Sequence, residues 1–171
     1  MRGGAWLSRG KRPWKERGSA MIEATLVLVF LFALIFLLID LSWAVFAKAT
    51  LQNAVRAGAR YAVTSQTSIN PGTGLALGQV ASIQQVVQEQ AMGFLSDTST
   101  ISVTFYAVGT NPPTQLTGVG SNAGGNLVMV SVVGYTLSPL APLLRSATPV
   151  TITVSAGDLI EATPLTGLPP L

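Results

Sequence analysis

Residues 17–23 read RGSAMIE, and they join a short basic leader to a long apolar run. From Ala24 to Ile39 the only polar residue is Thr25, and Asp40 is followed by the mainly apolar stretch 41–47. A helix needs about 20 largely apolar residues to cross the hydrocarbon of a bilayer. The sequence therefore predicts one membrane-spanning helix, with its membrane part over about residues 20–46.

Basic residues are concentrated before this junction. Residues 1–18 carry six basic side chains and one acidic side chain, whereas the rest of the chain carries four basic and six acidic ones. Positive charges beside the first membrane segment favour the cytoplasmic side, so we expect residues 1–18 to be a cytoplasmic leader. The sequence pI of 9.7 mainly reflects this leader. The chain shows no clustered basic surface of the kind that nucleic-acid binding requires, and we expect no nucleic-acid partner.

The composition restricts the chemistry that the chain can perform. Its 171 residues are 49% hydrophobic and only 10% charged, which allows one small domain beside the helix. Cysteine and histidine are both missing, which removes disulfides, thiolate chemistry, the commonest general base and the commonest transition-metal ligand. The glycines of Gly118–Gly120 lack the spacing of a phosphate-binding loop. We expect no enzymatic activity, no bound metal and no cofactor.

The first helix is expected to extend well beyond the bilayer. No proline or glycine occurs between Ser19 and Ala57, so we expect an N-terminal helix over residues 19–64, with an amphipathic part over about 47–64. Polar residues recur every four positions on one side: Lys48, Gln52, Arg56 and Arg60. Apolar residues follow the helical spacing on the other side: Ala44, Ala47, Leu51, Val55, Gly58 and Ala62. The small residues of this second set allow another backbone to approach closely.

Residues 65–171 are expected to form a small domain outside the membrane. A loop with its turn at residues 70–72 precedes an amphipathic helix over about Gln79–Leu95. Alternating β-branched and aromatic residues then predict three strands. They cover residues 101–108, 127–137 and 150–155.

The connections between these strands differ in character. The long link 109–126 contains two prolines and a glycine pair, and we expect a mobile hairpin loop. Residues 138–145 are expected to form a crossover or a short helical turn. The predicted fold class is therefore α+β, in which the second helix and the outer half of the first pack on a three-stranded antiparallel sheet.

Two segments carry a family resemblance. RGSAMIE at residues 17–23 and NAVRAGARYA at residues 53–62 resemble the TadE-like pilus-assembly family. That family is a set of minor pilins or pseudopilins of the tight-adherence pilus, which is a Flp-type or type IVb pilus. The resemblance is strong over the leader and the first helix, and the later elements agree only in their order. It implies a pilin-like fold and a role in pilus assembly.

The resemblance also implies processing and partners. In such proteins a membrane-embedded prepilin peptidase, an aspartic protease, cuts after the leader glycine, which corresponds here to Gly18. Ser19 would then be the first residue and Glu23 the fifth. The implied partners are the membrane, the prepilin peptidase, pilin and other minor pilin subunits, and the inner-membrane platform of the pilus. The implied location is the bacterial inner membrane, with one span, a cytoplasmic N-terminus and a periplasmic or extracellular domain, or the pilus itself.

Glu23 lies near the start of the apolar run. An ionised group inside a membrane helix costs about 3 kcal/mol, and less near the interface. Cleavage after Gly18 would free an α-amine at Ser19 with a pKa of about 8, which is largely protonated at neutral pH. We expect Glu23 to pair with the amine of a neighbouring subunit and to set the axial register during assembly. Solvation of Glu23 by headgroups, or pairing with the amine of its own chain, remains open.

Two other interpretations of the leader also remain open. If the leader is never cut, it only holds the N-terminus on the cytoplasmic side through its positive charges, as a permanent anchor. A secretory signal peptide cleaved near residues 47–49 is a further alternative, although its apolar region normally has about 7 to 15 residues and ends close to the cut.

The outer half of the first helix has two candidate roles. Its predicted interface residues are either core of the chain's own domain or a contact between subunits: Leu51, Val55, Gly58 and Ala62. Arg56 and Arg60 are either solvated or partners in ion pairs between subunits. The alternative function is a permanently membrane-anchored periplasmic binding or adhesion module whose loop 109–126 contacts a surface.

Overall fold

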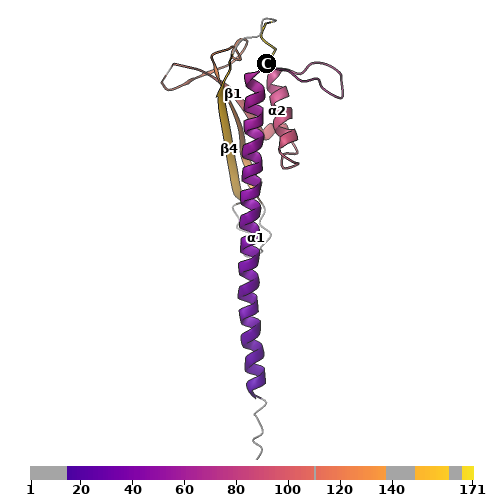
Figure 1. The fold of residues 1–171 in the computed structure, drawn as a ribbon, viewed down its shortest axis with the longest axis vertical. Helices are drawn as coiled ribbons and strands as arrows, with labels where there is room; N and C mark the ends of the chain where they lie inside the picture. The colour runs from indigo at the N-terminus through magenta and orange to yellow at the C-terminus, as the bar shows by residue number, and fades with distance from the viewer. Residues whose placement is uncertain (1–14, 110, 138–148, 162–166) are drawn as a thin grey trace, which may run out of the picture.

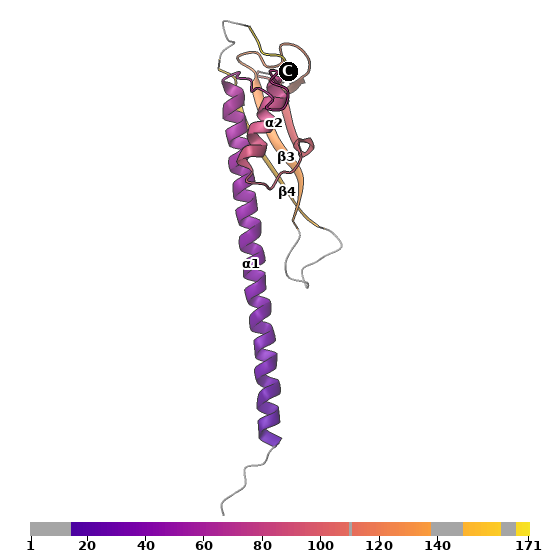
Figure 2. The same cartoon turned by 90° about the vertical axis from the view of Figure 1, so that its right-hand side faces the viewer.

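The computed structural model describes residues 15–109, 111–137, 149–161 and 167–171. In chain order its elements are α1 (Lys15–Val63), α2 (Gln79–Gln90), the short 3-10 helix η1 (Thr98–Thr100), β1 (Ile101–Ala107), β2 (Thr114–Leu116), β3 (Leu127–Leu137) and β4 (Val150–Leu159). Figure 1 shows α1 as a long rod, with α2 and the strands gathered around its C-terminal half. Figure 2 shows from the side that no other labelled element accompanies the N-terminal half.

The helix α1 is uninterrupted, as the sequence predicts, and it begins at Lys15 rather than at residue 19. Its 49 residues extend for about 74 Å at about 1.5 Å per residue. The helix ends at Val63, where Thr64 N donates to Tyr61 O at 3.3 Å. Ser65, with a φ of 51°, then takes the left-handed conformation that commonly closes a helix. The next segment therefore turns back toward α2.

The sheet has four strands, so the prediction of three strands is wrong. The strand order is β2-β1-β3-β4, and every neighbouring pair is antiparallel. The additional strand β2 lies in the link 109–126 and pairs with the end of β1, where Phe105 is opposite Leu116. A strand of three residues after two prolines is too short to show a period, and this is why the sequence did not reveal it. The link therefore contributes an edge strand to the sheet.

Three predicted boundaries are also wrong. The strand β4 continues to Leu159 instead of stopping at residue 155, because residues 156–158 keep pairing with β3 although they break the apolar alternation. The helix α2 stops at Gln90, five residues early, because Met92 and Gly93 have positive φ values of 51° and 84°. The strand β1 ends one residue earlier than predicted. The predicted crossover 138–145 lies outside the described residues.

The core lies between the C-terminal half of α1, the helix α2 and one face of the sheet. Alternate residues of β3 point into it, and Val128, Val130 and Val132 are completely buried. The helix α1 contributes mainly small side chains to this core: Ala47, Leu51, Ala54, Val55, Ala59 and Ala62. The predicted apolar side of the outer helix is thus confirmed as a packed face.

Glycine 58 sets the distance between the two helices. A Cβ atom at Gly58 would collide with Cγ2 of Val87 on α2 and would lie 3.6 Å from Cγ1 of Val130 on β3. Because valine is stiff at χ1, Val87 cannot easily move aside. The absence of a side chain at this position therefore lets α1 approach α2 and the sheet at the same height.

A buried polar network closes the end of the domain farthest from the apolar half of α1. The side chain of Gln79, at the start of α2, donates to the carbonyl of Ala62 at 3.1 Å. Asn122 Nδ2 donates to Gln79 Oε1 at 2.6 Å and to the carbonyl of Pro169 at 2.9 Å. Both amides are buried, with exposed fractions of 0% and 1%. The network thus ties α1, α2, the β2–β3 connection and Pro169 together.

Replacing Asn122 with alanine should lower the free energy of unfolding by about 1–3 kcal/mol, because Gln79 Oε1 would lose its donor while remaining buried. The measurement is thermal or urea unfolding of the full chain in detergent. The matched control is Asn53→Ala on the exposed side of α1, which should change that free energy by less than about 0.5 kcal/mol. Equal effects of the two substitutions would contradict a structural role for the network.

Candidate functional site

The N-terminal half of α1 is an apolar surface that the described part of the chain leaves uncovered. Met21 is 76% exposed and Phe30 is 70% exposed, and the large apolar residues between positions 21 and 46 are all more than 40% exposed. The helix is long and apolar enough to cross a membrane, and none of its most apolar window is buried against the protein. Soluble monomers rarely expose so large an apolar surface. This half of α1 is therefore the candidate membrane anchor, as predicted.

Polar side chains within this half are satisfied by the helix itself. Thr25 Oγ1 donates to the carbonyl of Met21 at 2.8 Å, and Ser42 Oγ donates to the carbonyl of Leu38 at 2.7 Å. In hydrocarbon an unsatisfied hydroxyl is costly, so hydrogen bonds of this type make both residues compatible with lipid. The acidic residues Glu23 and Asp40 lie directly before and after the most apolar stretch of α1, residues 24–39.

The predicted cleavage residues lie in the first turns of α1. Gly18 and Ser19 are exposed, and a Cβ atom at Gly18 would meet no heavy atom within 4 Å. Ser19 and Glu23 are four residues apart and so lie on the same face, one helical turn apart. Glu23 is also exposed. The geometry therefore places the residue after the predicted cleavage site and the carboxylate on one exposed face of the helix.

The predicted helix interface lies inside the domain. Leu51, Val55 and Ala62 have exposed fractions of 0%, and Gly58 is buried against α2 and β3. This placement favours the interpretation of these residues as core of their own chain. A contact between subunits through the same residues stays a prediction.

The two arginines of the outer helix lie on the opposite, exposed side. Arg56 and Arg60 line a groove of about 550 Å³ between α1, the segment after it and α2. The other residues along this groove are uncharged: Asn53, Ala57, Tyr61, Thr64, Gln66 and Val86. Partial burial raises the pKa of Tyr61 above its usual value of 10.0, so the phenol stays neutral there. The structure shows a positively charged groove, and the predicted ion pairs between subunits remain untested.

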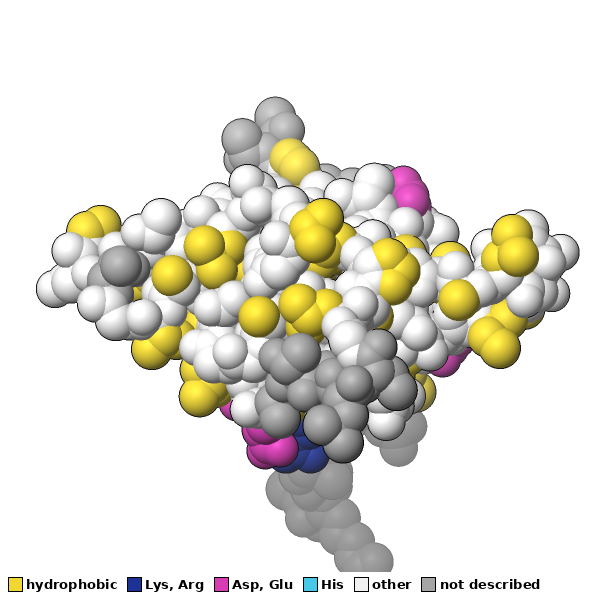
Figure 3. Space-filling view, turned by 90° about the horizontal axis from the view of Figure 1, so that it is seen from above, with side chains coloured by type: hydrophobic (Ala, Val, Ile, Leu, Met, Phe, Trp, Pro, Cys, Tyr) yellow, Lys and Arg dark blue, Asp and Glu magenta, His cyan; other side chains and the backbone are white. Residues whose placement is uncertain are grey.

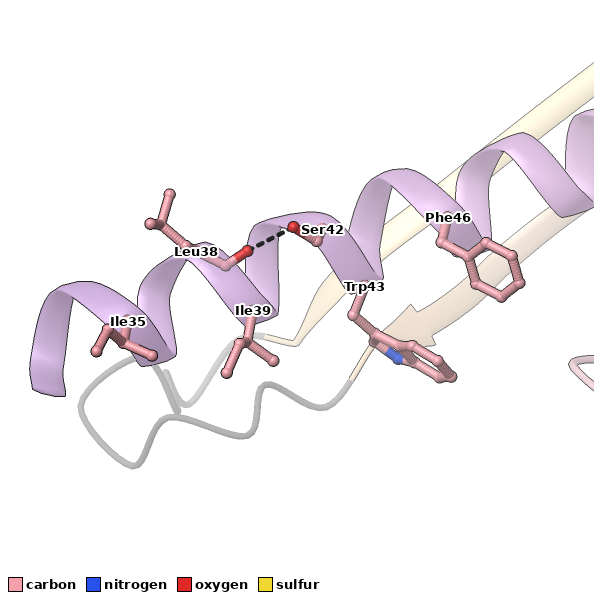
Figure 4. A pocket seen from close by; sticks show the side chains of 6 residues that line it. All are labelled: Ile35, Leu38, Ile39, Ser42, Trp43 and Phe46. Carbon is pink, nitrogen blue, oxygen red and sulfur yellow. Dashed lines mark hydrogen bonds between the residues drawn. The ribbon is translucent and has the colours of Figure 1, made fainter.

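Aromatic rings join the domain to the start of the apolar half. The ring centroids of Trp43 and Phe46 lie 5.5 and 5.9 Å from that of Phe94, which follows α2. Phe94 in turn meets Tyr135 of β3 edge to face at 5.9 Å. Figure 4 shows Ile39, Trp43 and Phe46 on one side of α1, along an apolar groove of about 580 Å³. We refer to Trp43, Phe46, Phe94 and Tyr135 as the aromatic collar, a feature that the sequence analysis did not predict.

Charged side chains are sparse on the end of the domain away from the apolar half of α1 (Figure 3). Figure 3 looks onto the end of the molecule away from the apolar half of α1, and it shows mixed apolar and uncharged polar side chains with few charges. Among the described residues, no group of three or more His, Cys, Asp or Glu side chains could hold a metal ion.

Comparison with protein families connects this geometry to a known group of proteins. Residues 18–60 match the family model described as TadE-like protein. The TadE-like match begins at the predicted cleavage glycine, covers the apolar half of α1 and continues into the packed half. It confirms the resemblance seen in the sequence over these residues and suggests involvement in pilus assembly. The match covers about a quarter of the chain and leaves out α2 and the sheet.

Other comparisons give no further relatives. No curated protein and no solved structure matches the chain.

Leu51→Ala should lower the free energy of unfolding of the domain by about 2–5 kcal/mol, because it leaves a cavity in place of a completely buried side chain. The matched control is Leu31→Ala, at a residue of the same helix that is 50% exposed, and it should leave domain unfolding nearly unchanged. Urea unfolding of the full chain in detergent measures both. An unchanged stability for Leu51→Ala, combined with weaker association between copies, would instead favour a subunit interface.

Proposed function

We propose that this protein is a minor pilin or pseudopilin that takes part in assembly of a tight-adherence, type IVb pilus. The observation that carries the proposal is that the TadE-like match coincides with a helix whose first half is exposed and apolar and whose second half belongs to a folded domain. Such a helix can hold the chain in a bilayer and later present the same apolar surface to other helices. Residues 1–18 would be cytoplasmic and the domain periplasmic or extracellular.

Processing by a prepilin peptidase after Gly18 is part of the proposal. A protease needs access to the peptide bond, whereas here the bond lies within the first turns of a helix. Glycine costs about 1 kcal/mol relative to alanine in a helix, so local unwinding is easiest at this residue. Its open surroundings also leave room for an enzyme.

The new N-terminus and Glu23 supply the proposed assembly contact. An exposed carboxylate among apolar side chains is stabilised when a cation pairs with it. Lipid tails and apolar side chains are about equally good partners for α1, so burial of apolar area contributes little to helix association inside the bilayer. A charge pair between subunits would then contribute strongly to the choice of register. The proposed partners are the prepilin peptidase, pilin and other minor pilin subunits, and the inner-membrane platform.

The direct test is the intact mass of the membrane-extracted protein, produced with and without a prepilin peptidase. We expect a loss equal to the mass of residues 1–18 only when the peptidase is present. A chain that stays uncut in both samples would contradict processing and favour a permanent anchor. A cut after residues 47–49 would instead identify a signal peptide.

Glu23→Ala should reduce incorporation into pili or pilus-base complexes by about tenfold or more, because the α-amine would lose its partner, and a tenfold change corresponds to about 1.4 kcal/mol. Membrane insertion should be unchanged. Quantitative immunoblotting of sheared pili and of membranes measures both amounts. The control is Glu89→Ala, which removes an acidic side chain of the domain. Normal assembly of Glu23→Ala would refute the register role.

A permanently anchored adhesion module is the second candidate, and one observation favours it. Val119 is fully exposed in a turn between two glycines of positive φ, Gly118 and Gly120. An apolar tip of this kind can contact a surface. Deleting the whole link would also remove buried Asn122, so Val119→Ser is the cleaner variant. Loss of attachment with normal pili would support adhesion, and loss of pili would support assembly.

A further inference from the structure

The turn after α2 exposes an apolar side chain where the backbone is strained. Met92 has a φ of 51°, the left-handed conformation, and its side chain is 73% exposed. At the end of a helix this position normally carries glycine, which adopts the conformation without strain. The chain instead places glycine one residue later, at Gly93. A strained, exposed methionine calls for a function outside the domain's own packing.

Met92 lies against the aromatic collar. Together with Trp43, Phe46, Phe94 and Tyr135 it lines a hollow of about 340 Å³ at the end of the domain nearest the apolar half of α1. Trp43 and Phe46 are 46% and 47% exposed although they contact Phe94. The collar and Met92 therefore form one apolar surface that continues directly into the exposed surface of residues 21–46.

The height of this surface along α1 can be compared with the thickness of a bilayer. If the hydrocarbon, about 30 Å thick, is centred between the acidic residues Glu23 and Asp40, it ends between one and two residues beyond Asp40 at about 1.5 Å per residue. Trp43 then lies about 2 Å and Phe46 about 7 Å outside the hydrocarbon, within a headgroup layer of about 5–8 Å. Phe94 and Met92 share this height because they border Phe46.

We propose that Met92 and the aromatic collar form a second membrane contact, which inserts into the headgroup region of the phospholipid leaflet next to the domain. Tryptophan and tyrosine favour that layer because they combine an apolar ring with a polar atom, and methionine adapts its shape to a disordered surface. The inference rests on the membrane placement of α1, but not on cleavage or on the pilus. With two contacts, the domain is held against the bilayer and its rotation about the axis of α1 is restricted. For the chain to leave the membrane and enter an assembly, both α1 and the aromatic collar with Met92 would have to be released from the lipid.

The test uses single thiols, because the chain has no cysteine of its own. Met92→Cys in the full chain is labelled with an environment-sensitive NBD fluorophore and placed in nanodiscs of phosphatidylcholine and phosphatidylglycerol, at one chain per disc. We expect blue-shifted emission and at least twofold quenching by lipids that carry a nitroxide near the headgroup. The matched control is Val119→Cys, at another exposed apolar position, close to Asn122 and therefore at the opposite end of α2. Its emission should be that of a label in water.

Three further outcomes separate the possible failures. A third label at Phe30→Cys reports the span itself. Lipid-like emission at position 30 with water-like emission at position 92 would overturn this inference and leave the anchor intact, whereas water-like emission at both would refute the anchor. A blue shift at position 92 that occurs only with two chains per disc, without quenching by the nitroxide lipids, would show that a second copy covers the collar and would also overturn the proposal.

Discussion

The structure depends on one continuous helix whose two halves need different surroundings. In the N-terminal half of α1 the apolar side chains point outward on all sides and are satisfied only by lipid or by other apolar helices. In the C-terminal half one side is packed beneath α2 and the sheet, and the other carries exposed arginines. Because no proline or glycine interrupts the join between the halves, the position of the anchor fixes the position of the domain along the helix axis.

The domain packs against α1 through small side chains along the helix and through contacts at both ends of α2. Alanine and glycine on the packed side allow close approach, and Gly58 in particular lets Val87 and Val130 meet the helix backbone. Contacts of opposite character hold the two ends of α2. At its start Gln79 joins a buried amide network, and beyond its end the ring of Phe94 packs on Trp43 and Phe46. The polar end faces away from the proposed membrane, and the aromatic end faces toward it.

Sequence periodicity predicted the parts of this fold in which one residue pattern extends over many positions. The packed face of α1 and the strand Leu127–Leu137 were predictable because burial on one side repeats along them. The 49-residue helix was predictable from its long apolar run and from the lack of proline and glycine between residues 19 and 57. The strand Thr114–Leu116 is too short to have a period, and Gly157 hid the end of β4. The Gln79–Asn122 hydrogen bond and the contacts of Phe94 with Trp43, Phe46 and Tyr135 join residues about 40 or more positions apart, and their pairing depends on the tertiary fold. The sequence also predicted the exposed apolar half of α1, which is the candidate membrane anchor. The cleavage and register roles of Gly18, Ser19 and Glu23 stay predictions.

The most direct test that the two halves of α1 lie in different surroundings is thiol accessibility along the helix. It is measured with a membrane-impermeant maleimide in spheroplasts whose inner membrane is intact. Single cysteines are introduced at Phe30 and at Ala49, which are both exposed in the structure but lie in the apolar and the packed half respectively. The account predicts that Ala49→Cys reacts from outside the cell at once and that Phe30→Cys reacts only after detergent is added. Rapid reaction of Phe30→Cys in intact spheroplasts, or protection of Ala49→Cys until the membrane is opened, would contradict it.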